Sequence, residues 1–401
     1  MPGQTRDAAI VGIYEYPLRK IEELSPLQIK AECAVRALED AGLTWKDVDS
    51  VYEAGEGGAV LSGVASTPEY FGVTSNVTDT TMTGGSSYEF HAAHAKRAIA
   101  AGKSKVALLT YGSTMRRDAI ALGSGGRTLG QAGPIHPVSN LEDIWGLTLV
   151  GDYAMVAQRH MHDYGTTSEQ LAEISVATRL HATRNPEALR AMEDLAFKST
   201  AEVTVEDVVN SRMIADPLHM LECCMISDGG GAVVIASADV ARGCRQTPAW
   251  IIGTGEAVKY PENNGDITTS AAARSGPSAF GEAGVRPDEI DIAMLYDSFT
   301  ITALAVIEDL GFCKKGEGGS FVQGGRLRFD TPDAPALNTA GGGLSSNHPG
   351  MRGIFLLIEA TRQLRGRSTS QVANAKLAVA SGLGGRLGSR HAAGTVVLGA
   401  G

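Results

Sequence analysis

An internal repeat constrains the fold of this chain more than any other feature of its sequence. The first copy predicts a strand, a helix, a strand, a glycine-rich turn opening a helix, and a strand, in AAIVGI (8–13), SPLQIKAECAVRALEDAG (25–42), LTWKDVDSVYEAG (43–55), TGGSS (83–87) and VALLTYG (106–112). The second copy keeps this order in AWIIGTGEA (249–257), SAFGEAGVRPDEIDIAMLYDS (278–298), NTAGGGLSS (338–346), GIFLLIEATRQLRG (353–366) and KLAVASGLGG (376–385). Ala41-Gly42 thus corresponds to Ala283-Gly284, and Asp49 corresponds to Asp291.

Strands that alternate with helices predict an α/β architecture, in which helices cover the sheets and the crossovers are right-handed. Buried helices rich in Ala and Gly fit between two sheets. We therefore expect a five-layered α/β/α/β/α fold built from two duplicated halves. The two glycine-rich turns then occupy equivalent places in the two halves and look onto one shared crevice.

The repeat also divides the chain into parts. We expect an N-terminal half, an inserted loop or lid domain, and a C-terminal half, comprising residues 1–112 with 226–248, residues 113–225, and residues 249–401. Within the insertion, the segment 123–140 is rich in Gly, Pro and Ser and is expected to be mobile. The segment 164–190 predicts mostly one helix.

Composition and charge exclude several classes of function. A net charge of −10 without a basic run argues against nucleic acid as a partner. The 5 cysteines are odd in number and show no CxxC or Cys/His spacing, so they predict neither a disulfide framework nor a metal site. No apolar run is long enough to span a membrane or to serve as a signal peptide. We expect a soluble, cytoplasmic protein.

The segment TGGSSYEFH (83–91) has the layout of a catalytic turn. A helix N-terminus offers free backbone N–H groups and the positive end of the helix dipole, and enzymes often place a nucleophile there. Here Ser86 and Ser87 follow the glycines, and no cysteine is near in sequence. The segment is therefore either a catalytic turn with an altered nucleophile or a tight turn that binds without attacking.

Two further constellations carry polar groups at predicted strand ends or turns. Tyr296 and Asp297 stand where a strand of the second half leaves the sheet, and Asp297 or Ser298 could instead simply cap the next helix. His348 lies in GGGLSSNHPGMRG (341–353), where the following proline favours a fixed, extended backbone. A rigid histidine between two glycine-rich turns suits a general base, although a loop histidine can also be structural. The glycines of SGLGGR (381–386) allow close approach to a substrate.

Taken together, these segments resemble the thiolase superfamily, and more narrowly its sterol-carrier or lipid-transfer-protein branch. The resemblance rests on the duplicated halves, on DGGGAVV, on YDSFT…EDLGFCKKGEGG, on NTAGGGLSSNHPGMRG and on QLRG, and covers nearly the whole chain. It implies the same five-layered fold and a homodimer. It also implies that coenzyme A is part of the substrate, as an acyl-CoA, with no covalently bound cofactor and no metal.

The chain departs from the thiolase pattern at both of its cysteines. The nucleophile block falls on TGGSSYEF, where Gly85 or a neighbour takes the cysteine's place, and the second cysteine falls on Ser381. The His-Asp-x-Phe turn of the branch becomes Tyr296-Asp297-Ser298-Phe299, whereas the Gly-His-Pro turn keeps its histidine as Asn347-His348-Pro349. A serine hydroxyl is far less acidic than a thiol, so the usual thiolysis lacks its thiolate.

The resemblance therefore implies acid–base chemistry on an acyl-CoA, as in the retro-aldol cleavage of a β-hydroxyacyl-CoA with a steroid or lipid side chain. We expect Tyr296, His348 and Asp297 to carry the catalysis. Substrate and oxyanion binding are expected at Gly85, Ser86, Ser87, Asn347, Ser381 and Gly382. Related aldolases also work with a small zinc-ribbon/OB-fold partner protein. Two alternatives stay open, namely a β-ketoacyl-CoA thiolase (acetyl-CoA acetyltransferase) with an unorthodox nucleophile and a non-catalytic acyl-CoA or lipid-binding subunit.

Overall fold

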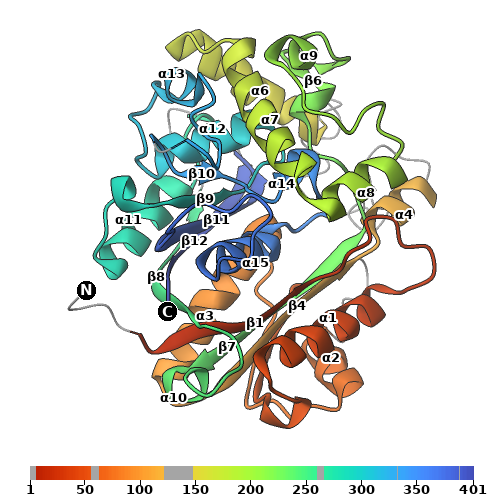
Figure 1. The fold of residues 1–401 in the computed structure, drawn as a ribbon, viewed down its shortest axis with the longest axis vertical. Helices are drawn as coiled ribbons and strands as arrows, with labels where there is room; N and C mark the ends of the chain where they lie inside the picture. Colours follow the sequence, from red (N-terminus) through yellow and green to blue (C-terminus); the bar gives the residue numbers. More distant parts are fainter. Residues whose placement is uncertain (1–5, 56–62, 122–147, 260–265, 332, 388) are drawn as a thin grey trace.

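The two predicted copies form two half-sheets with the same strand order. The structure is a computed structural model that describes residues 6–55, 63–121, 148–259, 266–331, 333–387 and 389–401 (Figure 1). In the N-terminal half the order is β3-β2-β4-β7-β1, and in the C-terminal half it is β10-β9-β11-β12-β8. The strands are β1 Ala8–Glu15, β2 Ser50–Tyr52, β3 Val77–Asp79, β4 Val106–Ser113, β7 Gly229–Ser237, β8 Ala249–Lys259, β9 Ile292–Leu295, β10 Ala336–Leu337, β11 Leu377–Arg386 and β12 Ser389–Gly399.

The half-sheets are joined at one edge. β1 and β8 are equivalent strands, and they pair antiparallel through Ala9 with Trp250 and Ile10 with Ala249. This short contact links all the strands above into one 10-stranded sheet, where the sequence predicted two separate sheets. Antiparallel pairing of equivalent strands relates the two halves by an approximate two-fold rotation.

Helices cover both half-sheets and fill the space between them (Figure 1). Helix α1 packs on β1, β4 and β7, and α11 packs on β8 and β12, so these two helices form outer layers. Helices α3 and α15 contact each other and strands of both half-sheets, so they form the central layer. The five-layered α/β/α/β/α arrangement is confirmed. The helices are α1 Pro26–Ala41, α2 Gly63–Phe71, α3 Ser87–Ala100, α4 Met115–Ala121, α10 Ala238–Ala241, α11 Ala272–Ala283, α12 Thr300–Asp309, α13 Gly318–Val322, α14 Gly342–Ser345 and α15 Gly353–Leu364.

Residues paired by the repeat have the same local structure. Gly42 and Gly284 both end a helix in the left-handed conformation, with φ of 77° and 66°. Asp49 stands before β2 and accepts hydrogen bonds from the backbone N–H groups that open β4. Asp291 stands before β9 and accepts the same bonds from the residues that open β11. A glycine C-cap and an aspartate that ties two strands together are thus built twice from the same sequence signals.

The described part of the insertion is helical and lies over one end of the molecule (top in Figure 1). Its elements are α6 Leu149–Tyr164, α7 Ser168–Thr183, α8 Pro186–Asp194, α9 Val205–Val209 and the hairpin β5 Met213–Ala215 with β6 Leu218–His219. The helix predicted over most of 164–190 is present as α7, with Thr167 as its N-cap, but it ends at Thr183. The side chain of Asn185 caps a new helix that has Pro186 in its first turn. The segment 123–140 lies outside the described residues.

Candidate active site

Tyr296 lies directly after β9, between the two glycine-rich turns. Its hydroxyl donates a hydrogen bond to the carbonyl oxygen of Gly350 at 2.8 Å. Its ring packs so closely on Gly85 that a Cβ added there would overlap the ring. The ring also meets the ring of His348 edge-on, with centroids 5.4 Å apart. Burial raises the pKa of Tyr296 well above its usual value, so this hydroxyl holds its proton.

His348 has a fixed backbone and a ring without hydrogen-bond partners. The backbone N–H of His348 donates to Ser227 Oγ at 3.0 Å, and this bond fixes the position of the turn. The side chain is buried, yet neither ring nitrogen has a partner among the described residues. Burial, reinforced by the charge of Arg352, lowers the pKa of His348 to about 3, so the imidazole is neutral at physiological pH. One ring nitrogen then donates and the other accepts.

Asp297 is fully buried and bonds the backbone of the glycine-rich turn that carries His348. Its carboxylate accepts hydrogen bonds from the Gly343 N–H at 2.8 and 2.9 Å and from the Leu344 N–H at 3.5 Å. Asp297 therefore caps α14 rather than α12, the helix that follows it in sequence. Burial raises the pKa of Asp297, although the nearby Arg352 guanidinium and the N–H bonds oppose the shift. The contacts of Asp297 are those of a group that positions the His348 turn.

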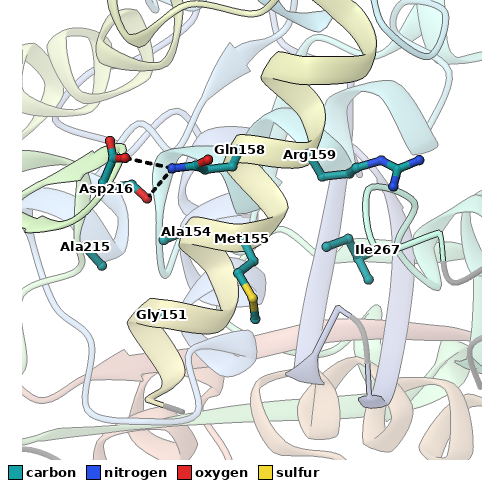
Figure 2. Close-up of a pocket in the computed structure, with 8 residues that line it drawn as sticks. All are labelled: Gly151, Ala154, Met155, Gln158, Arg159, Ala215, Asp216 and Ile267. Carbon is teal, nitrogen blue, oxygen red and sulfur yellow. Dashed lines mark hydrogen bonds between the residues drawn. The ribbon is translucent and has the colours of Figure 1, made fainter. Parts of the chain in front are cut away.

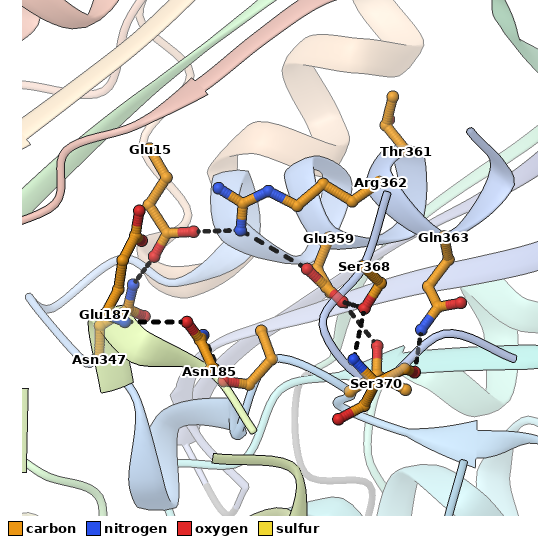
Figure 3. Close-up of polar contacts among 12 residues, drawn as sticks. Glu15, Asn185, Glu187, Asn347, Glu359, Thr361, Arg362, Gln363, Ser368 and Ser370 are labelled. Atoms are coloured by element: carbon orange, nitrogen blue, oxygen red, sulfur yellow. Dashed lines mark hydrogen bonds and ion pairs between the residues drawn. The ribbon is translucent and has the colours of Figure 1, made fainter. Parts of the chain in front are cut away.

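A buried network of charges fixes the orientation of Asn347 (Figure 3). Asn347 Nδ2 donates to Glu15 Oε1 at 2.6 Å, and Arg362 Nη1 donates to Glu15 Oε2 at 2.8 Å. Burial opposes ionisation of Glu15, but Arg19 and Arg362 outweigh it and lower its pKa. Because the amide N–H faces a charged carboxylate, the amide oxygen is left without a partner. The unpartnered atom of Asn347 is thus an acceptor, which fits the substrate binding expected at this residue better than the oxyanion binding.

Ser86 and Ser87 use their hydroxyls to close the TGGSS turn. Ser86 Oγ donates to the Thr83 carbonyl at 3.1 Å, and Ser87 Oγ donates to the Gly84 carbonyl at 2.7 Å. The two side chains are buried, and among the described residues neither hydroxyl forms a hydrogen bond with a base. These contacts favour a turn that binds over a turn that attacks.

Ser381 and Gly382 lie next to each other on β11 but face opposite sides. Ser381 Oγ lies 3.1 Å from Thr395 Oγ1, which in turn lies 2.8 Å from Ser275 Oγ on the outer helix α11. The Ser381 hydroxyl therefore faces the outer layer, away from the turn that bears Gly85. Gly382 faces inward, where an added Cβ would overlap the carboxyl group of Glu89. Strand alternation thus brings Gly382, and not the Ser381 side chain, to the site.

Two residues of this region were not predicted from the sequence. Glu89 is buried on α3 with both carboxyl oxygens unpartnered in the described part of the chain. Arg352 is buried beside the turn, with Nε donating to the Asn347 carbonyl at 3.1 Å and lying 3.7 Å from Asp297 Oδ1. The sequence signals were weak: one acidic residue within an otherwise apolar turn of helix, and one arginine after NHPGM.

The cysteines supply no thiolate to this site. Burial raises the pKa of Cys33, Cys223, Cys224, Cys244 and Cys313, and each is a free thiol. Cys224 lies beside this region, where its backbone N–H donates a hydrogen bond to the Ser298 carbonyl.

Among the residues that the structure describes, no group of His, Cys, Asp and Glu side chains could hold a metal ion. In the same part of the chain, no helix is long and apolar enough to cross a membrane.

Two surface hollows lie outside this constellation. One, of about 640 Å³, runs along the face of α6 that carries Met155, Gln158 and Arg159, and Gln158 Nε2 bonds Asp216 across it (Figure 2). The opposite face of α6 carries Tyr153, which packs on Phe299 with ring centroids 4.8 Å apart. The second hollow, of about 330 Å³, opens beside the site, because Ile226 in its wall forms a β-bridge with His348. Its other lining residues include Lys20, Arg116, Leu195 and Phe197.

Comparison with known proteins identifies the family. Residues 253–400 match the family model described as thiolase C-terminal domain-like. An acetyl-CoA acetyltransferase of Methanothermobacter thermautotrophicus is 32% identical, covering 96% of this chain and 98% of its own. A steroid side-chain-cleaving aldolase of Thermomonospora curvata is also 32% identical, covering 91% and 92%. The solved Ltp2-ChsH2(DUF35) aldolase superposes with a TM-score of 0.85 at 30% identity, covering 98% of each chain. The chain belongs to the thiolase superfamily and is one of its enzymes.

Proposed function

We propose that this protein cleaves a β-hydroxyacyl-CoA by a retro-aldol reaction, without a covalent intermediate. The observation that carries the proposal is the packing of the Tyr296 ring on Gly85. In a thiolase that place carries the nucleophilic cysteine, and here a tyrosine next to a neutral histidine fills the space instead. Neutral hydroxyl and imidazole groups suit proton transfer. Ser86 and Ser87, the serines of the turn, bond backbone carbonyls rather than a base that would activate them for acyl transfer.

In this reaction the β-hydroxyl loses its proton and the bond between the α- and β-carbons breaks. The bond's electron pair passes to the thioester as an enolate, which is then protonated at the α-carbon. The products are a ketone or aldehyde and a shorter acyl-CoA. Tyr296 is the hydroxyl group closest to the proton that moves, and its partner His348 has a free ring nitrogen to relay it. Backbone N–H groups of the glycine turns would hold the thioester oxygen.

The hollow beside His348 suits an acyl-CoA in its chemistry. Leu195, Phe197 and Ile226 provide an apolar wall, and the charged lining residues are Lys20, Arg116 and Asp194. Arg116 is bonded to Asp228 at 3.1 Å and to Glu22 at 2.8 Å, which leaves the exposed Lys20 as the cation for a phosphate group. We propose that the substrate enters from this side.

The relatives support a lyase and a partner subunit. One full-length relative is named as a side-chain-cleaving aldolase, and the aldolase structure is named together with ChsH2(DUF35). We propose that this chain also works with a small partner protein, as a homodimer of thiolase-type chains. A second function, acetyl-CoA acetyltransferase, is favoured by the name of the relative with 96% coverage of this chain. It would require free coenzyme A as a cosubstrate.

Product analysis distinguishes the two functions. The purified protein would be incubated with a panel of β-hydroxyacyl-CoAs and, separately, β-ketoacyl-CoAs, each with and without free coenzyme A and a DUF35-type partner. We expect a carbonyl product and a shorter acyl-CoA from a β-hydroxyacyl-CoA without free coenzyme A. Tyr296→Phe should lower this rate by about 10²–10⁴-fold, as for loss of a general acid or base. Turnover only of β-ketoacyl-CoA with free coenzyme A would instead establish the acetyltransferase.

A further inference from the structure

Glu89 is a buried acid in the first turn of α3, and its carboxyl group bonds no other residue of the described chain. It lies on α3, one helical turn after Gly85, with 1% of its surface exposed. A Cβ added at Gly353, Gly382 or Gly394 would overlap its side chain. Gly353 begins α15, Gly382 lies on β11 and Gly394 lies on β12. The Glu89 side chain thus occupies the space that a larger residue would fill at three positions of the C-terminal half.

Glu89 differs from the other buried glutamates in having no partner for either carboxyl oxygen. The structural ones are bonded through at least one oxygen: Glu15 to Asn347 and Arg362, Glu53 to Lys30, Glu222 to His219 and Thr300, Glu308 to His160, and Glu359 to Thr339 and Ser368. Burying an unpaired polar group costs stability, and an acid in such a place stays neutral. Burial indeed raises the pKa of Glu89 well above its usual value.

The carboxyl group of Glu89 lies beside the backbone of the turn that carries Gly85. The Cβ positions of both Gly353 and Gly382 that meet Glu89 Oε2 also lie close to the carbonyl oxygen of Gly85, at 2.6 and 2.9 Å. Gly85 is the residue on which the Tyr296 ring packs, and Gly353 directly follows Arg352. Glu89 is thus the acid that reaches the inward face of β11, where the Ser381 hydroxyl does not.

Resting on the retro-aldol function proposed above, we propose that Glu89 is the catalytic acid that protonates the α-carbon of the thioester enolate. In that step the O–H bond of Glu89 breaks and a C–H bond forms from the enolate electron pair. The carboxylate left behind recovers a proton from the Tyr296–His348 pair, which took one from the β-hydroxyl. The cycle neither gains nor loses a proton and needs no co-reactant.

The test compares Glu89→Gln and Glu89→Asp with the wild-type protein. Because the acid is already neutral, glutamine matches its charge and size and should leave the fold intact. The readout is deuterium uptake at the α-carbon of acetyl-CoA and propionyl-CoA in heavy water. Here the cycle runs in reverse: Glu89 passes its proton to the Tyr296–His348 pair, and its carboxylate then removes an α-proton to form the enolate. Thr395→Val is the matched control, since Thr395 neighbours Gly394 on β12 but its hydroxyl faces α11. We expect Glu89→Gln to lose uptake about 10²–10⁴-fold, Glu89→Asp to keep part of it, and Thr395→Val to keep it.

A second readout does not depend on turnover. Infrared spectra of the wild-type protein should show the carbonyl band of a protonated acid that Glu89→Gln lacks, and bound acetyl-CoA should shift that band. Uptake by a folded Glu89→Gln protein, or a band that bound acetyl-CoA leaves in place, would overturn the role of Glu89 alone. If the wild-type protein neither exchanges α-protons nor cleaves any β-hydroxyacyl-CoA, the proposed function fails, and this role fails with it.

Discussion

At the residue scale, the proposed site concentrates buried polar atoms that have no partner within the described chain. They are the two ring nitrogens of His348, the amide oxygen of Asn347, Nη1 of Arg352 and both carboxyl oxygens of Glu89. Each costs folding free energy, because water no longer solvates it and no protein group replaces the water. Such groups fit a role in binding, since a ligand can supply the missing partners.

Replacing His348 with leucine should separate stability from activity. Leucine removes two unpartnered nitrogens, so we expect a free energy of unfolding at pH 7 that is unchanged or higher by about 1 kcal/mol. Cleavage and α-proton exchange should be lost. The comparison uses urea unfolding followed by circular dichroism, alongside the activity assays. A variant that is much less stable would show instead that the ring holds the turn together.

The pKa of His348 also predicts how the difference in stability between the wild-type protein and His348→Leu depends on pH. The pKa of His348 in the folded protein is about 3, below the value of about 6.5 expected in the unfolded chain. As pH falls from 6.5 toward 3, His348 binds a proton in the unfolded wild-type chain but not in the folded protein. The free energy of unfolding of the wild-type protein therefore decreases. The advantage of His348→Leu should therefore grow by up to about 1.4 kcal/mol per pH unit in that window. A constant difference between pH 7 and pH 4 would contradict the buried, neutral histidine.

Much of the site was predictable one residue at a time, and its geometry was not. Tyr296 and His348 follow local signals that left a structural interpretation open, a polar residue at a strand end and a histidine before proline, and the structure brings their rings together. Glu89 becomes recognisable only when three distant glycines are seen to enclose it. Ser381 was predicted on the binding side because the register of β11 decides its face, and a shift of one residue reverses every face of a strand.

At the scale of elements, the internal repeat makes the fold predictable from the sequence. Helix ends carry glycine at matching positions, and the strand order of each half repeats that of the other. Sequence reasoning failed where a single proline outweighed helical periodicity, at the junction of α7 and α8. It also missed the edge contact between β1 and β8, because pairing between halves leaves no local pattern to read.

The paired aspartates give a test of the repeat. Asp49 accepts from the backbone N–H groups of Lys105 and Val106, and Asp291 accepts from those of Lys376 and Leu377. We expect Asp49→Ala and Asp291→Ala each to lower the free energy of unfolding by about 1–3 kcal/mol, since each leaves strand-opening N–H groups unpaired. Asp288→Ala is the control and should cost less than about 1 kcal/mol, because it breaks an exposed pair with Arg286. Urea unfolding measures all three. Asp49 also accepts a hydrogen bond from Ser104 Oγ at 2.6 Å, so its loss should be the larger of the two. A loss at either aspartate that is no greater than the loss at the control would contradict their shared role.

At the scale of the whole molecule, the thiolase architecture is retained, while Gly85 and Ser381 stand where the resemblance places the two cysteines of thiolases. The helix N-terminus that carries the nucleophile in thiolases here begins with glycines and with serines that bond their own turn. Tyr296 packs on that turn and its ring meets the ring of His348. Glu89 lies against the inward face of β11. The relatives carry names from both chemistries, so overall similarity alone does not separate a lyase from a transferase.

The central claim is that this site forms a thioester enolate without forming an acyl-enzyme. The most direct measurement incubates the wild-type protein with propionyl-CoA in heavy water without free coenzyme A, and weighs both the acyl-CoA and the intact protein by mass spectrometry. The account predicts deuterium at the α-carbon and an unchanged protein mass. A protein that gains the mass of the acyl group would contradict it, because some side chain would then act as a nucleophile, a role that the account gives to no residue of the site.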